Sequence, residues 1–110
     1  MIDWDRVREL HSEVGAEDFA EVVDLFLAEV DEATARLAAG PDLTRLKDDL
    51  HFIKGSAYNL GFARLGALCA DGEQQATAGD AAGVDVAAIL DCYATSRQDF
   101  VEGLDRDGLV

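Results

Sequence analysis

The sequence predicts an all-α protein, with four helices in an antiparallel up-down bundle and a short N-terminal helix capping one end. Apolar residues recur at spacings of three and four along most of the 110 residues, and no stretch keeps the alternation of a β-strand. Pro41 is the only proline, so little interrupts helical structure. Short breaks separate the long amphipathic stretches, and such connections favour antiparallel neighbouring helices.

The periodicity places the helices in order, over residues 3–13, 17–39, 42–60, 62–78 and 85–105. Gly15 is expected to end the first helix, and acidic residues at the start of the second favour its N-terminus through the helix dipole. In the break before the third helix, Asp42 is the predicted N-cap. Gly61 is expected to end that helix in the left-handed conformation, and residues 79–83 to form a turn.

The amino-acid composition argues against two classes of binding partner, nucleic acid and anionic membranes. With 23 acidic and 9 basic residues the net charge is −14, which repels nucleic acid and anionic membranes. No apolar run approaches the roughly 18 residues of a membrane span, and the N-terminal residues lack the features of a signal peptide. We therefore expect a cytoplasmic protein with neither kind of partner. Cys69 and Cys92 lack the paired spacing of a zinc site, so we expect buried free thiols and no metal.

The functional signal lies in the stretch HFIKGSAYNLG at residues 51–61. At about 100° per residue, Lys54 lies about 60° to one side of His51 and Gly55 about 40° to the other. The apolar residues of this helix cluster on the far side, so His51 is expected to project into water. An exposed imidazole beside a cation and a bare glycine suits a nucleophile that takes and returns a phosphoryl group. His11, the other histidine, has no such neighbours.

Basic residues gather around this stretch in an otherwise acidic chain. Of the nine basic residues, four are Arg45, Lys47, Lys54 and Arg64. They leave the region around His51 far less acidic than the rest of the sequence. Such a local relief of negative charge is what a phosphoryl-bearing site requires.

Residues 51–61 closely resemble the active-site helix of histidine-containing phosphotransfer (HPt) domains, which reads H-x-x-K-G-S-[AS]-x-x-x-G. The likeness extends to the flanking helices, at Phe19, Phe26, Leu65, Leu68 and Cys69. It implies that residues 1–110 form a single HPt-like domain, a phosphorelay intermediary of two-component signal transduction. The partners implied are receiver domains of response regulators or of a hybrid histidine kinase.

The resemblance also implies roles for individual residues. A receiver domain carrying phosphoaspartate would dock on the helix, and His51 would take the phosphoryl group and later pass it to a second receiver. Lys54 is expected to stabilise the charge of the transferring group, and Gly55 to leave room for the docked receiver. The further docking residues expected are Tyr58, Lys47, Phe52 and Arg64. Magnesium would be held by the receiver, so we expect no cofactor on this chain, and we expect it to be a monomer.

One departure from the family pattern concerns Gly72-Glu73, which replaces a frequent leucine-glutamate; the glycine is expected to loosen the end of its helix. No glycine-rich phosphate loop is present, so we expect a phosphocarrier without ATP-dependent kinase activity. Two other classes stay open. One is a non-catalytic acidic helical bundle that binds a protein partner. The other is a metal-carboxylate bundle enzyme, whose inward Glu-x-x-His motifs neither histidine provides.

Overall fold

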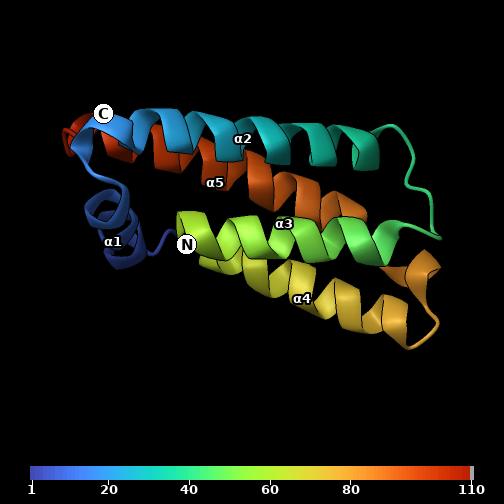
Figure 1. The fold of residues 1–110 in the computed structure, drawn as a ribbon. Helices are drawn as coiled ribbons and strands as arrows, with labels where there is room; N and C mark the ends of the chain where they lie inside the picture. Colours follow the sequence, from blue (N-terminus) through green and yellow to red (C-terminus); the bar gives the residue numbers. More distant parts are fainter. Residues whose placement is uncertain (110) are drawn as a thin grey trace.

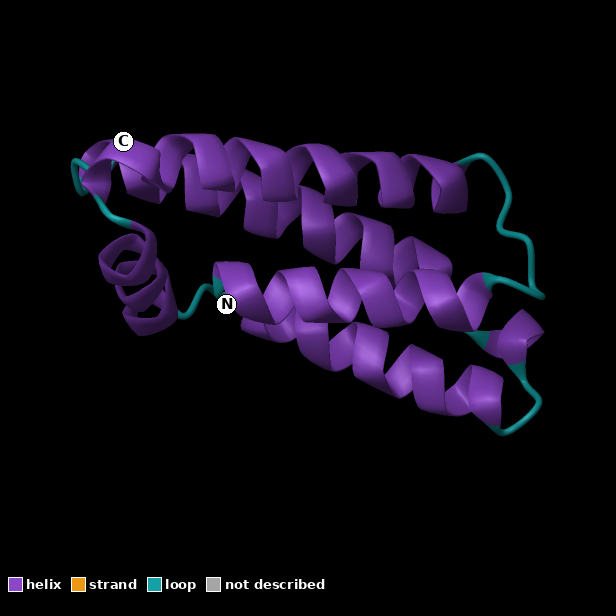
Figure 2. Ribbon diagram, viewed as in Figure 1, coloured by secondary structure: helices purple, strands orange, loops and turns teal. Residues whose placement is uncertain are grey.

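The computed structural model describes residues 1–109, which form five α-helices and a short 3-10 helix and contain no β-strand (Figure 2). In order, the elements are α1 (Trp4–Val14), α2 (Ala16–Ala38), α3 (Leu46–Leu60), α4 (Ala63–Thr77), the 3-10 helix η1 (Ala81–Gly83) and α5 (Val86–Arg106). The all-α prediction is confirmed, and every predicted helix is present with its ends displaced by at most a few residues.

The helix ends follow local capping chemistry. The Asp3 carboxylate accepts a hydrogen bond from Arg6 N at 3.2 Å and so starts α1. Gly61 has φ 82° and ψ 16°, the left-handed conformation predicted for the end of α3. The segment predicted as a plain turn, residues 79–83, contains η1, which the Asp80 carboxylate caps by accepting from Gly83 N at 3.1 Å.

The prediction that Asp42 is the N-cap of α3 is wrong. Its carboxylate accepts hydrogen bonds from N and Oγ1 of Thr44, at 3.0 and 2.7 Å, and its carbonyl accepts one from Arg45 N at 2.9 Å. These bonds close a separate turn, because an aspartate can satisfy amides two residues on as readily as it can cap a helix. The helix therefore begins later, at Leu46.

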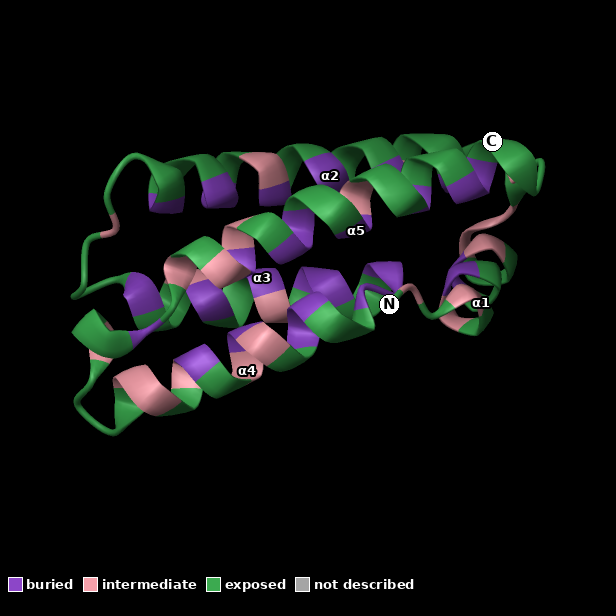
Figure 3. Ribbon diagram, turned by 180° about the vertical axis from the view of Figure 1, so that it is seen from behind, coloured by how far each residue is buried: buried purple, intermediate pink, exposed green. Residues whose placement is uncertain are grey.

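The four longer helices lie side by side along one axis of a molecule measuring 43 × 23 × 20 Å (Figure 1). Contacts connect α2 with α3, α3 with α4, α4 with α5 and α5 with α2, so the buried faces of all four meet in one core. Figure 3 shows this burial, with the buried positions of each helix on its inner side. Phe19, Phe62 and Phe100 are among the largest fully buried side chains.

Helix α1 lies across one end of this arrangement, where it contacts α2 and α3 (Figure 1). Asp3 N donates to the Gly61 carbonyl at 2.7 Å, and Arg6 Nε donates to the Asn59 carbonyl at 3.2 Å. A Cβ atom on Gly61 would lie 2.6 Å from the Asp3 carbonyl oxygen, so the close approach of these segments requires glycine. The end of α3 is therefore fixed by the N-terminal segment.

A polar cluster joins α2 to α5. Arg97 donates from Nε and Nη2 to the two carboxylate oxygens of Asp31, both at 3.0 Å, and the Tyr93 hydroxyl donates to Asp31 Oδ1 at 2.5 Å. The bonds from Arg97, and then the bond from Tyr93, hold the pKa of Asp31 below its ordinary value. This cluster fixes the position of α5 along α2.

Two further sequence predictions concern the cysteines and membrane-spanning segments. Cys69 and Cys92 are free and buried, as expected, and burial raises the pKa of the Cys69 thiol to about 12. Within residues 1–109, none of the helices combines the length and apolar character that crossing a membrane requires.

Candidate functional site

Helix α3 presents His51 to solvent, as its periodicity predicts. The side chain of His51 is 69% exposed. The apolar residues of the opposite face are all buried, namely Leu46, Leu50, Ile53, Ala57 and Leu60. The core therefore holds the helix in the one rotation that keeps the imidazole outside.

The imidazole is oriented by Glu73 of α4, across the groove between the two helices. His51 Nδ1 lies 2.9 Å from Glu73 Oε1, within hydrogen-bond distance. An ionised carboxylate can only accept, so in the neutral imidazole Nδ1 is the nitrogen that carries the hydrogen and Nε2 keeps its lone pair. On this mostly exposed side chain, the nitrogen that Glu73 does not contact is thus the one available for reaction.

The same carboxylate binds Lys54. Glu73 Oε2 is buried and accepts no well-aligned hydrogen bond from the described residues, and Lys54 Nζ holds it as an ion pair at 2.8 Å. Lys54 first, and then His51, keeps the pKa of Glu73 below its ordinary value against the opposing effect of desolvation. One carboxylate therefore fixes both the ring and the cation.

Small residues on α4 allow the two helices to approach closely enough for this arrangement. Gly66 is buried beneath the ring of Tyr58, and a Cβ on it would clash with Tyr58 Cε1. Gly72 is also buried, and a Cβ on it would lie 2.9 Å from Leu50 Cδ1. Helix α4 continues past Gly72 to Thr77, and the glycine provides room for the α3 side chain; the expected loosening of the helix end stays a prediction.

Gly55 differs from these two glycines because its surroundings are empty. It is exposed, and apart from its own helix backbone and its two chain neighbours no atom of residues 1–109 lies within 4 Å of the place where its Cβ would stand. Packing between helices within this chain therefore gives no reason for a glycine here. Its position next to His51 leaves the backbone of α3 bare to an approaching molecule.

The other residues expected at the docking surface lie in different places. Phe52 and Tyr58 are 41% and 48% exposed, and Lys47 is exposed one turn before His51. Arg64 does not lie beside His51. It precedes Glu73 by nine positions on α4, which at 1.5 Å per residue separates them by roughly 14 Å along the helix.

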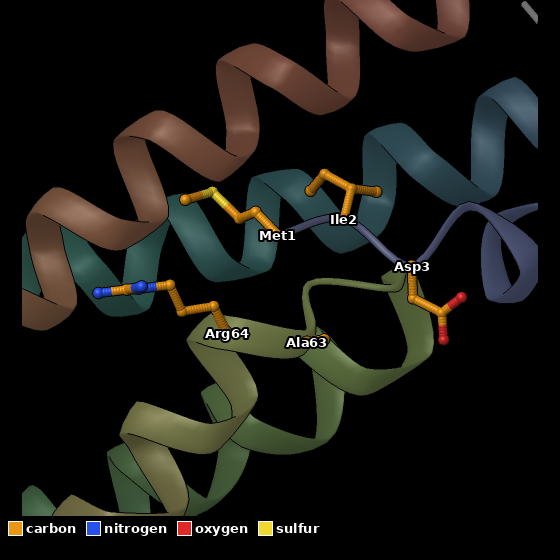
Figure 4. Close-up of a pocket in the computed structure, with 5 residues that line it drawn as sticks. All are labelled: Met1, Ile2, Asp3, Ala63 and Arg64. Atoms are coloured by element: carbon orange, nitrogen blue, oxygen red, sulfur yellow. The ribbon is translucent and has the colours of Figure 1, made fainter.

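Arg64 belongs instead to the opposite end of the α3–α4 pair. Figure 4 shows it beside the N-terminal segment, where it lines an open hollow of about 640 Å³ with Met1, Ile2, Asp3 and Ala63. It also lines a second hollow with Leu68 and residues of α5. A separate hollow of about 430 Å³ adjoins the histidine site and is lined by Lys54, Ala70, Glu73, Gln74, Thr77 and Ala78.

The sequence reasoning missed Glu73 as a site residue. The local signal was present, because Glu73 follows the buried Cys69 by one helical turn and so borders the inward face of α4. What was lacking was the register between α3 and α4. Among residues 1–109, no group of three or more histidine, cysteine, aspartate or glutamate side chains is arranged to hold a metal ion.

Comparison with known families agrees with this site. The family model of the Hpt domain matches residues 21–99, a span that includes all of α3 and α4. The chain belongs to the Hpt domain family. Membership implies a part in two-component phosphorelay signalling, and Hpt domains interact with receiver domains. Searches of curated proteins and of solved structures return no match.

Proposed function

We propose that this chain is a phosphorelay intermediary, which takes a phosphoryl group from a receiver-domain phosphoaspartate onto His51 Nε2 and passes it to another receiver. The observation that carries the proposal is the bond between His51 Nδ1 and Glu73, since it leaves Nε2 of this exposed side chain with a free lone pair in the neutral ring. The Hpt family match supports the same reaction class.

The transfer step forms one bond and breaks another. The Nε2 lone pair attacks phosphorus, the N–P bond forms, and the O–P bond breaks with its electron pair returning to the aspartate carboxylate. Catalysis then requires positioning and charge stabilisation rather than further covalent chemistry. Glu73 positions the ring, and Lys54 supplies the cation for the phosphoryl oxygens.

The proposal has further components. Magnesium is supplied by the receiver, and this chain acts as a phosphocarrier without ATP-dependent kinase activity. The longer helices α2 to α5 serve as an antiparallel up-down bundle that α1 caps. The protein works as a cytoplasmic monomer that does not bind nucleic acid or membranes.

The test is incubation with a phosphorylated receiver domain, followed by analysis of the label on this chain. Acid-labile, alkali-stable label is expected on the wild type and none on His51→Gln. The substitution is at an exposed position, so the free energy of unfolding should change by less than about 0.5 kcal/mol. The matched control is His11→Gln, which leaves labelling intact.

Two results would contradict the proposal. Label that persists in His51→Gln would assign the nucleophile to another side chain. A wild-type chain that binds the receiver and never becomes labelled would instead support a non-catalytic acidic binding module.

A further inference from the structure

Glu73 contacts the ring nitrogen opposite the reacting one, and this placement has consequences after phosphorylation. We propose that Glu73 keeps Nδ1 protonated once Nε2 carries the phosphoryl group, so that the phosphorylated chain is a fast donor with a short lifetime rather than a store. The inference rests on the proposed function. It assigns Glu73 as a positioning residue that controls the return step, beyond orienting the free imidazole.

The chemistry of the leaving group gives the reason. The lone pair of Nε2 is used in the N–P bond, so the phosphorylated ring is either neutral with a bare Nδ1 or cationic with a hydrogen on Nδ1. When an acceptor carboxylate attacks phosphorus, an O–P bond forms and the N–P bond breaks, with its electron pair returning to Nε2. The cationic ring then leaves as neutral imidazole, whereas the neutral ring would have to leave as an imidazolate anion.

In hydrolysis too, the ring leaves most readily when Nδ1 is protonated. Water attacks phosphorus, both of its hydrogens remain with the phosphate product, and the ring leaves as neutral imidazole with its hydrogen still on Nδ1. Protonation of Nδ1 therefore accelerates transfer and spontaneous loss together. Any group that retains this hydrogen shortens the lifetime of the phosphorylated state.

The structure shows why Glu73 can retain it. Its side chain is only 17% exposed and both of its oxygens are engaged, Oε1 with His51 and Oε2 with Lys54. It stays ionised, because Lys54 and His51 keep its pKa low. A carboxylate can accept a hydrogen from Nδ1 and cannot donate one, so it favours the protonated ring alone. A neutral amide at this position could bond to either form of the ring.

The other charged groups beside the ring lie on α3. Lys54 follows His51 by three positions, and Lys47 and Asp48 precede it by four and three. Lys54 opposes a positive ring, but it is paired with Glu73 Oε2 in this structure. Glu73 is the charged residue of α4 in direct contact with the imidazole.

The experiment compares the wild type with Glu73→Gln after labelling His51 with phosphoramidate, a small donor that needs no docking surface. Loss of label is followed from pH 5 to pH 9, alone and with an unphosphorylated receiver. At pH 8 we expect Glu73→Gln to lose label about two- to fivefold more slowly, the range that a partly exposed ion pair contributes. At pH 5 the rates should converge, because solvent protonates Nδ1 in both proteins.

The matched control is Asp71→Asn, which makes the same charge change at an exposed position of the same helix and should behave as the wild type. Nitrogen NMR of the phosphorylated chain gives a readout that a merely structural role would not move. It should show Nδ1 still protonated at pH 8 in the wild type and deprotonating at lower pH in Glu73→Gln. If Glu73→Gln does not fold, Glu73→Ala, which removes the carboxylate from Nδ1, replaces it with the same expected direction.

The outcomes separate the two proposals. If His51 is labelled normally and the pH profiles of wild type and Glu73→Gln coincide, or Nδ1 is bare at pH 8 in the phosphorylated wild type, the inference about Glu73 is overturned and the proposed function stands. If phosphoramidate places no label on His51 of the folded wild type, the proposed function fails, and the inference fails with it.

Discussion

Lys54 Nζ lies 2.8 Å from Glu73 Oε2, so the cation expected to meet a phosphoryl group is already paired with a carboxylate in the resting chain. A phosphoryl group carries up to about two negative charges near neutral pH, compared with one on Glu73. Phosphorylation of His51 therefore gives the ammonium a second anionic partner within one helical turn, beside Glu73. The ion pair keeps Lys54 beside the ring without burying it, since its side chain remains 27% exposed.

The first prediction concerns Lys54→Ala. This change should slow phosphoryl transfer more than it weakens receiver docking, because the ammonium acts on the transferring group. Transfer measured at fixed times with saturating receiver separates the two effects. Lys47→Ala makes the same charge change at an expected docking residue one turn before His51, so it should weaken docking without slowing transfer at saturation. A normal rate at saturation, combined with weaker binding, would assign Lys54 to the docking interface instead.

The exposure of His51 could be predicted because it depends on a local pattern. Apolar residues at a period of 3.6 determine which side of α3 is buried, and the histidine lies opposite that side. The left-handed Gly61 was equally predictable, because a glycine just after the last periodic residue is a local feature.

The pairing of His51 with Glu73 depends on a register that no local pattern contains. The two residues are 22 positions apart and lie on different helices. Their alignment is determined by Tyr58 against Gly66 and by Leu50 against Gly72, contacts that arise only when α3 and α4 pack. The place of Arg64 depends on the same packing, because nearness in sequence to His51 does not fix how far apart the two residues lie on the surface; its role in docking stays a prediction.

The second prediction is a pH dependence from the α2–α5 cluster. The pKa of Asp31 is lower in the folded chain than in the unfolded one, so the unfolded chain binds more protons in the interval between the two values. The cluster should therefore stabilise the fold above the ordinary aspartate pKa of about 3.9 and lose this contribution as pH falls towards the depressed value.

Asp31→Asn tests this directly. Urea unfolding at pH 7 should show a loss of about 1 kcal/mol or less, because the ion pair is nearly half exposed, and the loss should shrink at pH 3. Asp24→Asn, an exposed position on the same helix, is the control and should change little at either pH. A loss of equal size at both values would mean that the charge of Asp31 contributes nothing.

The last prediction separates docking from chemistry by means of Gly55. Gly55→Leu should keep or raise the free energy of unfolding, by up to about 1 kcal/mol, because leucine favours a helix and, beyond the local helix backbone, no atom of the described residues lies within 4 Å of the added Cβ. Gly61→Ala is the contrast: φ is 82° there and the Asp3 carbonyl is in the way, so thermal melting should show clear destabilisation.

Although Gly55→Leu should not lower stability, it should impair phosphoryl transfer. In Gly55→Leu a branched side chain stands about 40° from His51 and one turn along, between the imidazole and an approaching receiver. Transfer from a receiver should be lost, whereas labelling by phosphoramidate should continue at the wild-type rate, because that donor is small enough to reach Nε2. Most substitutions that abolish function also destabilise the protein, so loss of transfer with unchanged or raised stability would identify Gly55 as a clearance position for a protein partner. Normal transfer from the receiver to Gly55→Leu would show that the receiver approaches His51 from another side of α3.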